Sequence, residues 1–287
     1  MVAALARASY RTRHRVCPAC GRDNAAVDPG PYSKGEWQVK TCRGCGFVYL
    51  ENAPVYDDLA TTHAWEKSAP AEGALRRAES PVLQGLSKGT RFRLHWFKRT
   101  RLAKLAARYV PPGLVVDVGC GDGWQIANLP GDYVRCGIEI SQDMAARARA
   151  NLEPRGGFVV TAPAAEGLRS VPAGRFSGVV MRSFLEHDSE PRATLAGVAR
   201  ALRPGGAAII KVPNYASLNR LAMGKRWCGF RWPDHVNYFT PRSLARMVRN
   251  EGLVVARFGL VDHLPTSDNM WMVAGKPVAG KPVAGRP

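Results

Sequence analysis

Short apolar runs typical of β-strands alternate with segments of helical periodicity from residue 114 onward. Helices are predicted over 142–151 and 191–202 and from Pro241, with Ser141 and Thr240 as N-caps. The apolar runs predict strands over 114–118, 133–138, 158–161, 176–181, 207–212, 253–258 and 270–274. This alternation indicates an α/β fold with a mostly parallel sheet covered on both faces. In such sheets the ligand lies beyond the carboxyl ends of the strands.

A further helix is predicted over 91–109, immediately before the first of these strands. Its apolar residues fall on one stripe, and lysine and arginine fill most of the other positions. Such a helix either binds an anionic substrate or packs on the sheet with a solvated cationic face, and the apolar stripe favours packing.

Composition divides the rest of the chain into smaller segments. Residues 1–16 are rich in Ala and Arg, and the end of the chain repeats Val-Ala-Gly-Lys/Arg-Pro, which cannot build a core. The predicted organisation is a disordered N-terminus (1–16), a small domain with four cysteines (17–50), a linker (51–90), the main domain (91–275) and a disordered basic tail (276–287).

Four cysteines form two Cys-x-x-Cys-Gly turns, at Cys17 and Cys20 and at Cys42 and Cys45. Each turn directs two thiolates at one ion, and four thiolates satisfy the tetrahedral geometry that Zn²⁺ prefers in closed structural sites. The alternatives are four unrelated buried cysteines or a redox pair, and the second pair is unexplained by redox chemistry. The pattern therefore predicts a small zinc ribbon with one structural Zn²⁺.

The 287 residues carry a formal net charge of +18. Such a charge fits either an anionic partner or the arginine-rich composition of a GC-rich genome, and the spread of Arg along the chain favours the second. No apolar run is long enough to span a membrane, and the start lacks the features of a signal peptide. We therefore expect a cytoplasmic protein without a membrane span, while the oligomeric state stays open.

The candidate chemistry is concentrated where the first predicted strand ends. Three glycines follow it at spacings of two, Gly119, Gly121 and Gly123, and Glu139 ends the next strand. Glycines let the backbone turn sharply and let a ligand approach closely, and a downstream acid is suited to ribose hydroxyls. This combination predicts a site for a cofactor that contains a nucleoside.

Several landmarks in order resemble the class I S-adenosylmethionine-dependent methyltransferases, and specifically the ubiquinone-biosynthesis-type branch. The glycine loop from Asp117 to Gly123 and the acid Glu139 match that family's first two motifs. Leu185-Glu-His187 resembles the exit of its fourth strand, and Leu202-Arg-Pro-Gly-Gly206 resembles the turn before its fifth. The segment from His235 to Pro241 resembles a subgroup in which some members carry an N-terminal zinc ribbon.

The resemblance implies a Rossmann-like sheet of seven strands with the last strand antiparallel. It further implies a site for S-adenosyl-L-methionine formed by Asp117, Gly119, Gly121, Gly123, Glu139 and Ile140. Glu139 would accept both ribose hydroxyls, Ile140 would lie against adenine, and Asp117 would orient the loop and the amino end of the cofactor. Two departures concern the family's acids: 161–166 lacks the Asp often found near adenine, and Ser177 replaces an Asp in the fourth strand.

Methyl transfer to a hydroxyl or an amine near neutral pH requires a base, and the candidates are His187 and His235. His187 follows the fourth strand, and a structural role is the alternative for it. His235 lies in the irregular segment 213–239, whose aromatic residues suit a small organic or sugar substrate. Trp227, Trp232 and Tyr238 are therefore candidate substrate contacts; alternatively, the segment packs its own aromatic side chains.

Three function classes follow. The first is a methyltransferase that acts on a small molecule or a saccharide. The second, which is less favoured, is an RNA methyltransferase. It is considered because a zinc ribbon before this domain also resembles the bacterial ribosomal-RNA guanine methyltransferases and because the chain is basic. The third is a binding module that keeps the fold without catalysis.

Overall fold

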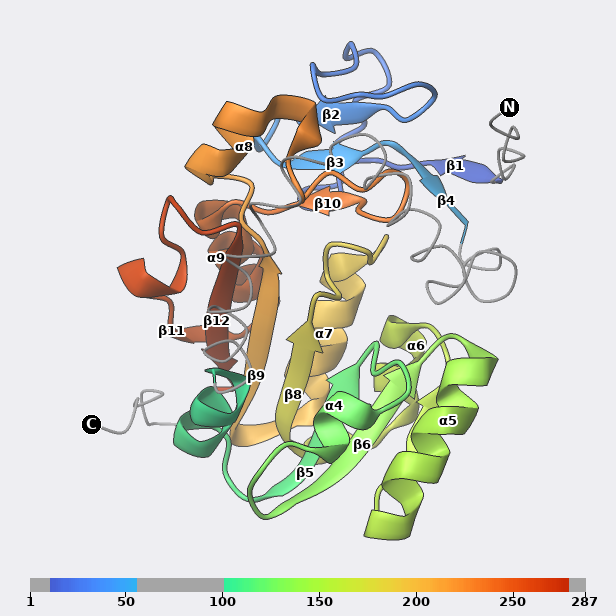
Figure 1. Ribbon diagram of the computed structural model, residues 1–287, viewed down its shortest axis with the longest axis vertical. Helices are drawn as coiled ribbons and strands as arrows, with labels where there is room; N and C mark the ends of the chain where they lie inside the picture. The colour runs from blue at the N-terminus through green and yellow to red at the C-terminus, as the bar shows by residue number, and fades with distance from the viewer. Residues whose placement is uncertain (1–10, 56–100, 279–287) are drawn as a thin grey trace, which may run out of the picture.

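The computed structural model describes residues 11–55 and 101–278 (Figure 1). The predicted linker from residue 56, the first half of the basic helix and the tail from residue 279 lie outside the described residues. Residues 101–109 are helical, and Leu102 and Leu105 are buried while Lys104 and Arg108 are exposed. This part of the basic helix therefore packs its apolar stripe against the sheet.

Seven strands form one sheet in the order β11-β12-β9-β8-β5-β6-β7. The strands β5 to β9 are parallel to their neighbours, and β12 is antiparallel to both β9 and β11, which confirms the predicted antiparallel last strand. The strands are β5 (Gly113–Val118), β6 (Tyr133–Glu139), β7 (Val159–Thr161), β8 (Phe176–Arg182), β9 (Leu202–Pro213), β11 (Val254–Arg257) and β12 (Asn269–Gly275).

Helices cover both faces of this sheet. Residues 101–109, α4 (Trp124–Ala127) and α5 (Gln142–Leu152) pack on one face. On the other face lie α6 (Ala164–Ser170), α7 (Pro191–Ala201) and α9 (Pro241–Asn250). Both predicted caps are confirmed: Ser141 accepts a hydrogen bond from the Met144 amide, and Thr240 forms a capping box with Ser243. Single 3₁₀ turns occur at η1 (Glu153–Arg155), η2 (Gly224–Arg226) and η3 (Leu260–Asp262).

The N-terminal segment consists of short strands and lies above the carboxyl end of β8 (Figure 1). β2 (Val39–Thr41) pairs with β3 (Val48–Leu50), and β1 (Thr12–His14) pairs with β4 (Asn52–Pro54). This pairing corrects two predicted boundaries, because β1 lies in the segment predicted to be disordered and β4 lies in the predicted linker. Each strand is ordered by a partner about 40 residues away, which local composition does not reveal.

The segment 213–239 is less irregular than predicted. It contains α8 (Leu218–Met223) and the two-residue strand β10 (Asn237–Tyr238), which pairs with β3. The three-stranded sheet β10-β3-β2 therefore joins the N-terminal segment to the main domain. The joint is also apolar, since Phe47 contacts Phe239 with ring centroids 5.2 Å apart and both are buried in the main core.

In the described parts of the chain, no helix has the length and the apolar character needed to cross a membrane.

Candidate active site

The glycine loop follows β5 directly, and its three glycines all have a positive φ, between 57° and 74°. A Cβ atom on Gly119 would lie 2.5 Å from the Phe184 ring, whereas a Cβ atom on Gly121 would meet nothing within 4 Å. Gly119 is therefore required by a close contact with the segment after β8. Gly121 faces open space, as the approach of a ligand to the backbone requires.

Glu139 ends β6 beside this loop, and only 9% of the residue is exposed. One carboxylate oxygen accepts a hydrogen bond from the Gly121 amide (2.8 Å), and the other accepts one from the Ser141 amide (3.0 Å). Two backbone donors thus fix the carboxylate at the open part of the loop. An ionised carboxylate has further lone pairs, so it could also accept hydrogen bonds from two hydroxyl groups of a ligand.

Asp117 lies one pairing position before the end of β5, opposite Val180 of β8. Burial raises the pKa of its carboxyl group to about 8, and the nearby Glu139 also raises it, while Arg182 lowers it. Asp117 is therefore largely protonated at neutral pH. A cation that arrived beside it would favour the ionised form.

Ile140 and residues 161–164 are half-buried, where β6 and β7 end. The Ala162 amide donates to the backbone oxygen of Glu139 (3.1 Å), so the segment after β7 is held against the end of β6. Ser177, which replaces the family's Asp, donates its hydroxyl to the Leu114 carbonyl at the opposite end of β5 (2.9 Å). Its role is thus to join two strands, away from the glycine loop.

The segment after β8 turns tightly toward the glycine loop. Ser183 has φ 57°, which is unusual for a residue other than glycine, and its hydroxyl accepts a hydrogen bond from Lys211 Nζ (2.6 Å). The His187 amide donates to the Phe184 carbonyl (2.8 Å), and the Phe184 ring lies against Gly119. This turn connects the glycine loop directly to the candidate base His187.

The structure brings His187 and His235 together, with ring centroids 4.6 Å apart and planes at 89°. His187 Nδ1 lies 2.9 Å from the Asp234 carbonyl oxygen, and His235 Nδ1 lies 2.8 Å from that of Gly229. Because a carbonyl oxygen only accepts, each Nδ1 carries a hydrogen, and in a neutral ring Nε2 is then the acceptor nitrogen. Burial lowers the pKa of His187 to about 4, with a contribution from Arg231, so its ring is neutral at pH 7.

Glu186 completes this group of side chains, although the sequence did not single it out. It is 1% exposed, and burial raises its pKa to about 7. One ligand atom each from Glu186, His187 and His235 lie within 4.8 Å of one another. Such a group can hold and pass protons, and its donor set is one that divalent metals accept. The sequence could have indicated Glu186 through its place in Leu185-Glu-His187. Its proximity to His235, however, depends on the fold and is not visible in the sequence.

The predicted substrate contacts lie in an aromatic cluster between segment 213–239 and the N-terminal strands. Trp227 and Tyr238 are 1% and 3% exposed, and Trp227 Nε1 donates to Asp268 (2.7 Å). Trp232 is half-buried and stacks on Phe230, with centroids 5.3 Å apart. The described geometry corresponds to the alternative in which the segment packs its own aromatic side chains.

The four cysteines of the two Cys-x-x-Cys-Gly turns converge, with all sulfur atoms within 4.8 Å of one another. The Cys17–Cys45 and Cys20–Cys42 sulfur pairs are each 3.6 Å apart. A tetrahedral ion with bonds of about 2.3 Å needs sulfur atoms roughly 3.8 Å apart, so the arrangement fits a zinc ion. Burial acts to raise the pKa of Cys42, but the amides of Cys45 and Gly44 lower it to about 6, whereas burial raises the pKa of Cys17 and of Cys45. A bound cation would favour the thiolate form of all four.

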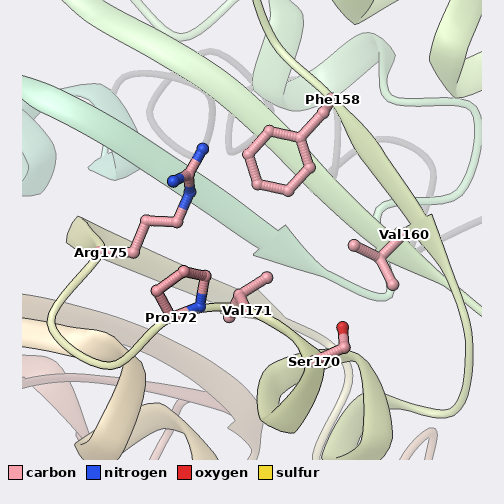
Figure 2. A pocket seen from close by; sticks show the side chains of 6 residues that line it. All are labelled: Phe158, Val160, Ser170, Val171, Pro172 and Arg175. Atoms are coloured by element: carbon pink, nitrogen blue, oxygen red, sulfur yellow. The ribbon is translucent and has the colours of Figure 1, made fainter.

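A cavity of about 310 Å³ lies away from these residues (Figure 2). Phe158 and Arg175, which immediately precede β7 and β8, contribute to its lining. It is therefore at the amino ends of parallel strands, opposite the edge where the glycine loop lies. Its position gives it no part in the candidate active site.

Comparison with known proteins decides the family of this chain. A family model described as a methyltransferase domain matches residues 92–257. The chain belongs to this methyltransferase family. S-adenosylmethionine is accordingly supported as its methyl donor, and the N-terminal cysteine segment lies before the matched region.

Two curated relatives of this methyltransferase are named as ubiquinone biosynthesis O-methyltransferases. The enzyme of Aromatoleum aromaticum is 31% identical over 173 residues, which cover 57% of this chain and 70% of the relative. The enzyme of Thiobacillus denitrificans is 30% identical over 147 residues, which cover 48% of this chain and 63% of the relative.

The fold is also found in a solved structure. A chain in the complex of the Haloferax volcanii Trm112 methyltransferase activator with a methyltransferase is 22% identical and aligns with a TM-score of 0.50. The alignment covers 68% of this chain and 95% of that chain. A methyltransferase from Archaeoglobus fulgidus gives 18% identity and a TM-score of 0.48, covering 63% of this chain and 93% of that chain. At these identities the likeness concerns the fold alone.

Proposed function

We propose that this methyltransferase transfers the methyl group of S-adenosylmethionine to a hydroxyl group of a small organic molecule. The observation behind this proposal is the contact between the imidazole rings of His187 and His235, which the Phe184 turn connects to the glycine loop, together with the burial that keeps the His187 ring neutral. A hydroxyl loses its proton as it attacks the methyl carbon, so a neutral base beside the cofactor is the group that this reaction needs. The O-methyltransferase names of the curated relatives agree with this acceptor.

The residues divide the work between binding the cofactor and accepting a proton. The bound sulfonium supplies an electrophilic methyl carbon, and Gly119, Gly121, Glu139 and Ile140 would hold the adenosine part in place. The acceptor hydroxyl would be aligned with the methyl carbon and sulfur, and its proton would move to Nε2 of His235 or His187. The Nδ1 atoms of both rings donate to backbone carbonyls, and in the neutral His187 ring this makes Nε2 the proton acceptor, which supports this role.

We also propose that Cys17, Cys20, Cys42 and Cys45 hold one structural zinc ion. Four sulfur ligands leave no open coordination position, so the ion would stabilise the fold and take no part in methyl transfer. The sulfur separations described above support the assignment, as do the glycines that follow each turn with positive φ, Gly21 at 76° and Gly46 at 73°.

The test is transfer of a labelled methyl group from S-adenosylmethionine to a panel of phenols, catechols, saccharides and ribosomal RNA. We expect product with hydroxyl compounds, and we expect His235→Gln to lower turnover far more than cofactor affinity. Methylation of RNA alone, with steep salt dependence, would instead support the RNA class. Cofactor binding without product from any acceptor would favour a binding module and contradict the proposal.

A further inference from the structure

Arg15 lies just before the first cysteine turn, in the segment that composition assigns to a disordered terminus, yet only 5% of the residue is exposed. Its Nη1 donates to the carbonyls of Leu50 (3.0 Å) and Val236 (3.1 Å). Its Nη2 donates to the Ser189 carbonyl (2.9 Å) and to Asn237 Oδ1 (3.0 Å). All four hydrogens on the two terminal nitrogens are therefore used, on acceptors from three different segments.

These acceptors surround the histidine pair. Val236 follows His235 directly, and Ser189 ends the turn that carries Glu186 and His187. The guanidinium thus bridges the two loops that present the imidazoles, and Leu50 anchors it to β3 of the N-terminal sheet.

Asn237 extends this bridge. Its side-chain amide donates to the carbonyls of Leu185 (2.7 Å) and Asp188 (2.6 Å), which flank Glu186 and His187 in the chain. The backbone amides of Val236 and Asn237 both donate to the Glu186 carbonyl, at 2.7 and 3.1 Å. Arg15 therefore holds Asn237, and Asn237 holds the backbone on both sides of the candidate catalytic group.

We propose that Arg15 is a positioning residue for the histidine pair, through which the N-terminal cysteine segment becomes part of the acceptor side of the active site. The catalytic part of this proposal rests on the proposed function, in which the histidine pair accepts the proton. Arginine suits this task because its planar fork reaches acceptors in several directions, whereas a lysine ammonium presents three donors at one point. The four hydrogen bonds described above all lead to segments around the histidine pair, so we expect Arg15 to act on the acceptor side.

The experiment compares Arg15→Ala and Arg15→Lys with Arg43→Ala, an exposed arginine of the same segment. Backbone hydrogen exchange, ¹⁵N imidazole spectra and S-adenosylmethionine affinity by calorimetry are measured for each. We expect Arg15→Ala to speed exchange at 184–189 and 235–238 roughly tenfold or more, because buried carbonyls lose their donor. The Nδ1–H signals of His187 and His235 should broaden or shift, cofactor affinity should stay within about twofold, and Arg43→Ala should match the unaltered chain.

Unchanged imidazole spectra and unchanged exchange in Arg15→Ala would overturn the proposal. A fall in affinity for S-adenosylmethionine as large as the increase in exchange rate would overturn it too. Should Arg15→Ala fail to fold, Arg15→Lys decides by the same criteria, with a smaller increase in exchange expected. None of these measurements uses an acceptor, so a failure to find any methylated product would count against the proposed function alone. Where a product is found, Arg15→Lys should lower kcat and leave the KM for S-adenosylmethionine unchanged.

Discussion

Glu139 and Gly121 form the part of the cofactor site that the structure defines most closely, because a hydrogen bond joins them and Gly121 faces open space. Replacing Glu139 by Ala removes the carboxylate that would accept two ribose hydroxyls. At about 1.5 kcal/mol for each hydrogen bond to a charged group, affinity for S-adenosylmethionine should fall roughly 100-fold. Gly121→Arg should weaken binding at least as strongly, because its side chain would fill the open space.

Calorimetric titration with S-adenosylmethionine checks both variants, and Glu36→Ala is the control because Glu36 is exposed in the N-terminal segment, outside the proposed cofactor site. Affinity equal to that of the unaltered chain in both site variants would refute the cofactor site.

Asp117 gives the site a dependence on pH. Its pKa is raised to about 8 in the structure, so at pH 7 the group is mostly protonated. If the cofactor's cationic groups bind beside it, its pKa falls and a proton is released. Affinity should therefore rise as pH increases toward about 8 and become constant above that value. Titration at pH 7 in buffers of different ionisation enthalpy measures the released proton, and the release should disappear in Asp117→Asn. Equal proton release in both proteins would show that Asp117 does not take part.

At the scale of elements, the sequence predicts those strands and loops that are defined by a local pattern of residues. The strands of the large sheet lie close to their predicted places, the glycine loop follows β5, and Glu139 ends β6 as expected. The exception is β9, which begins at Leu202, inside the segment 202–206 predicted as a turn, because Leu202 pairs with Phe176 of β8. The strands β1, β4 and β10 were missed because each has only two or three residues and is defined by a distant partner. Arg15 and Glu186 were missed for the same reason, since their roles depend on contacts between segments far apart in sequence.

The pairing of β3 with β10 connects the segment that carries the cysteine cluster to the main domain. We expect purified protein to contain about one zinc ion per chain, since four ligands form one closed site. Removal of the ion by a chelator should lower the midpoint of thermal unfolding, because thiolates gathered within 4.8 Å repel one another without a cation. Cys20→Ser should do the same, and Cys228→Ser, outside the cluster, should not. Full metal content in Cys20→Ser or an unchanged midpoint after chelation would contradict the assignment.

At the scale of the whole molecule, the fold places the proposed cofactor site and the proposed acceptor site at one edge of the sheet. The glycine loop and Glu139 come from the methyltransferase domain that the family match covers. The opposite side is formed by the segment after β8, by 213–239 and by the N-terminal strands, and the last two share an apolar cluster. Of these segments, only the N-terminal strands lie outside the region that the family model matches, so the proposed acceptor side combines family and additional structure.

The central claim is that a neutral histidine beside the cofactor accepts the proton of a hydroxyl acceptor. The most direct test is the single-turnover rate of methyl transfer in the unaltered chain, His187→Gln and His235→Gln, with cofactor affinity measured in parallel. We predict that at least one substitution lowers the rate 100-fold or more, within the range for general-base catalysis, while cofactor affinity changes little. Rates equal to that of the unaltered chain in both variants would contradict the account.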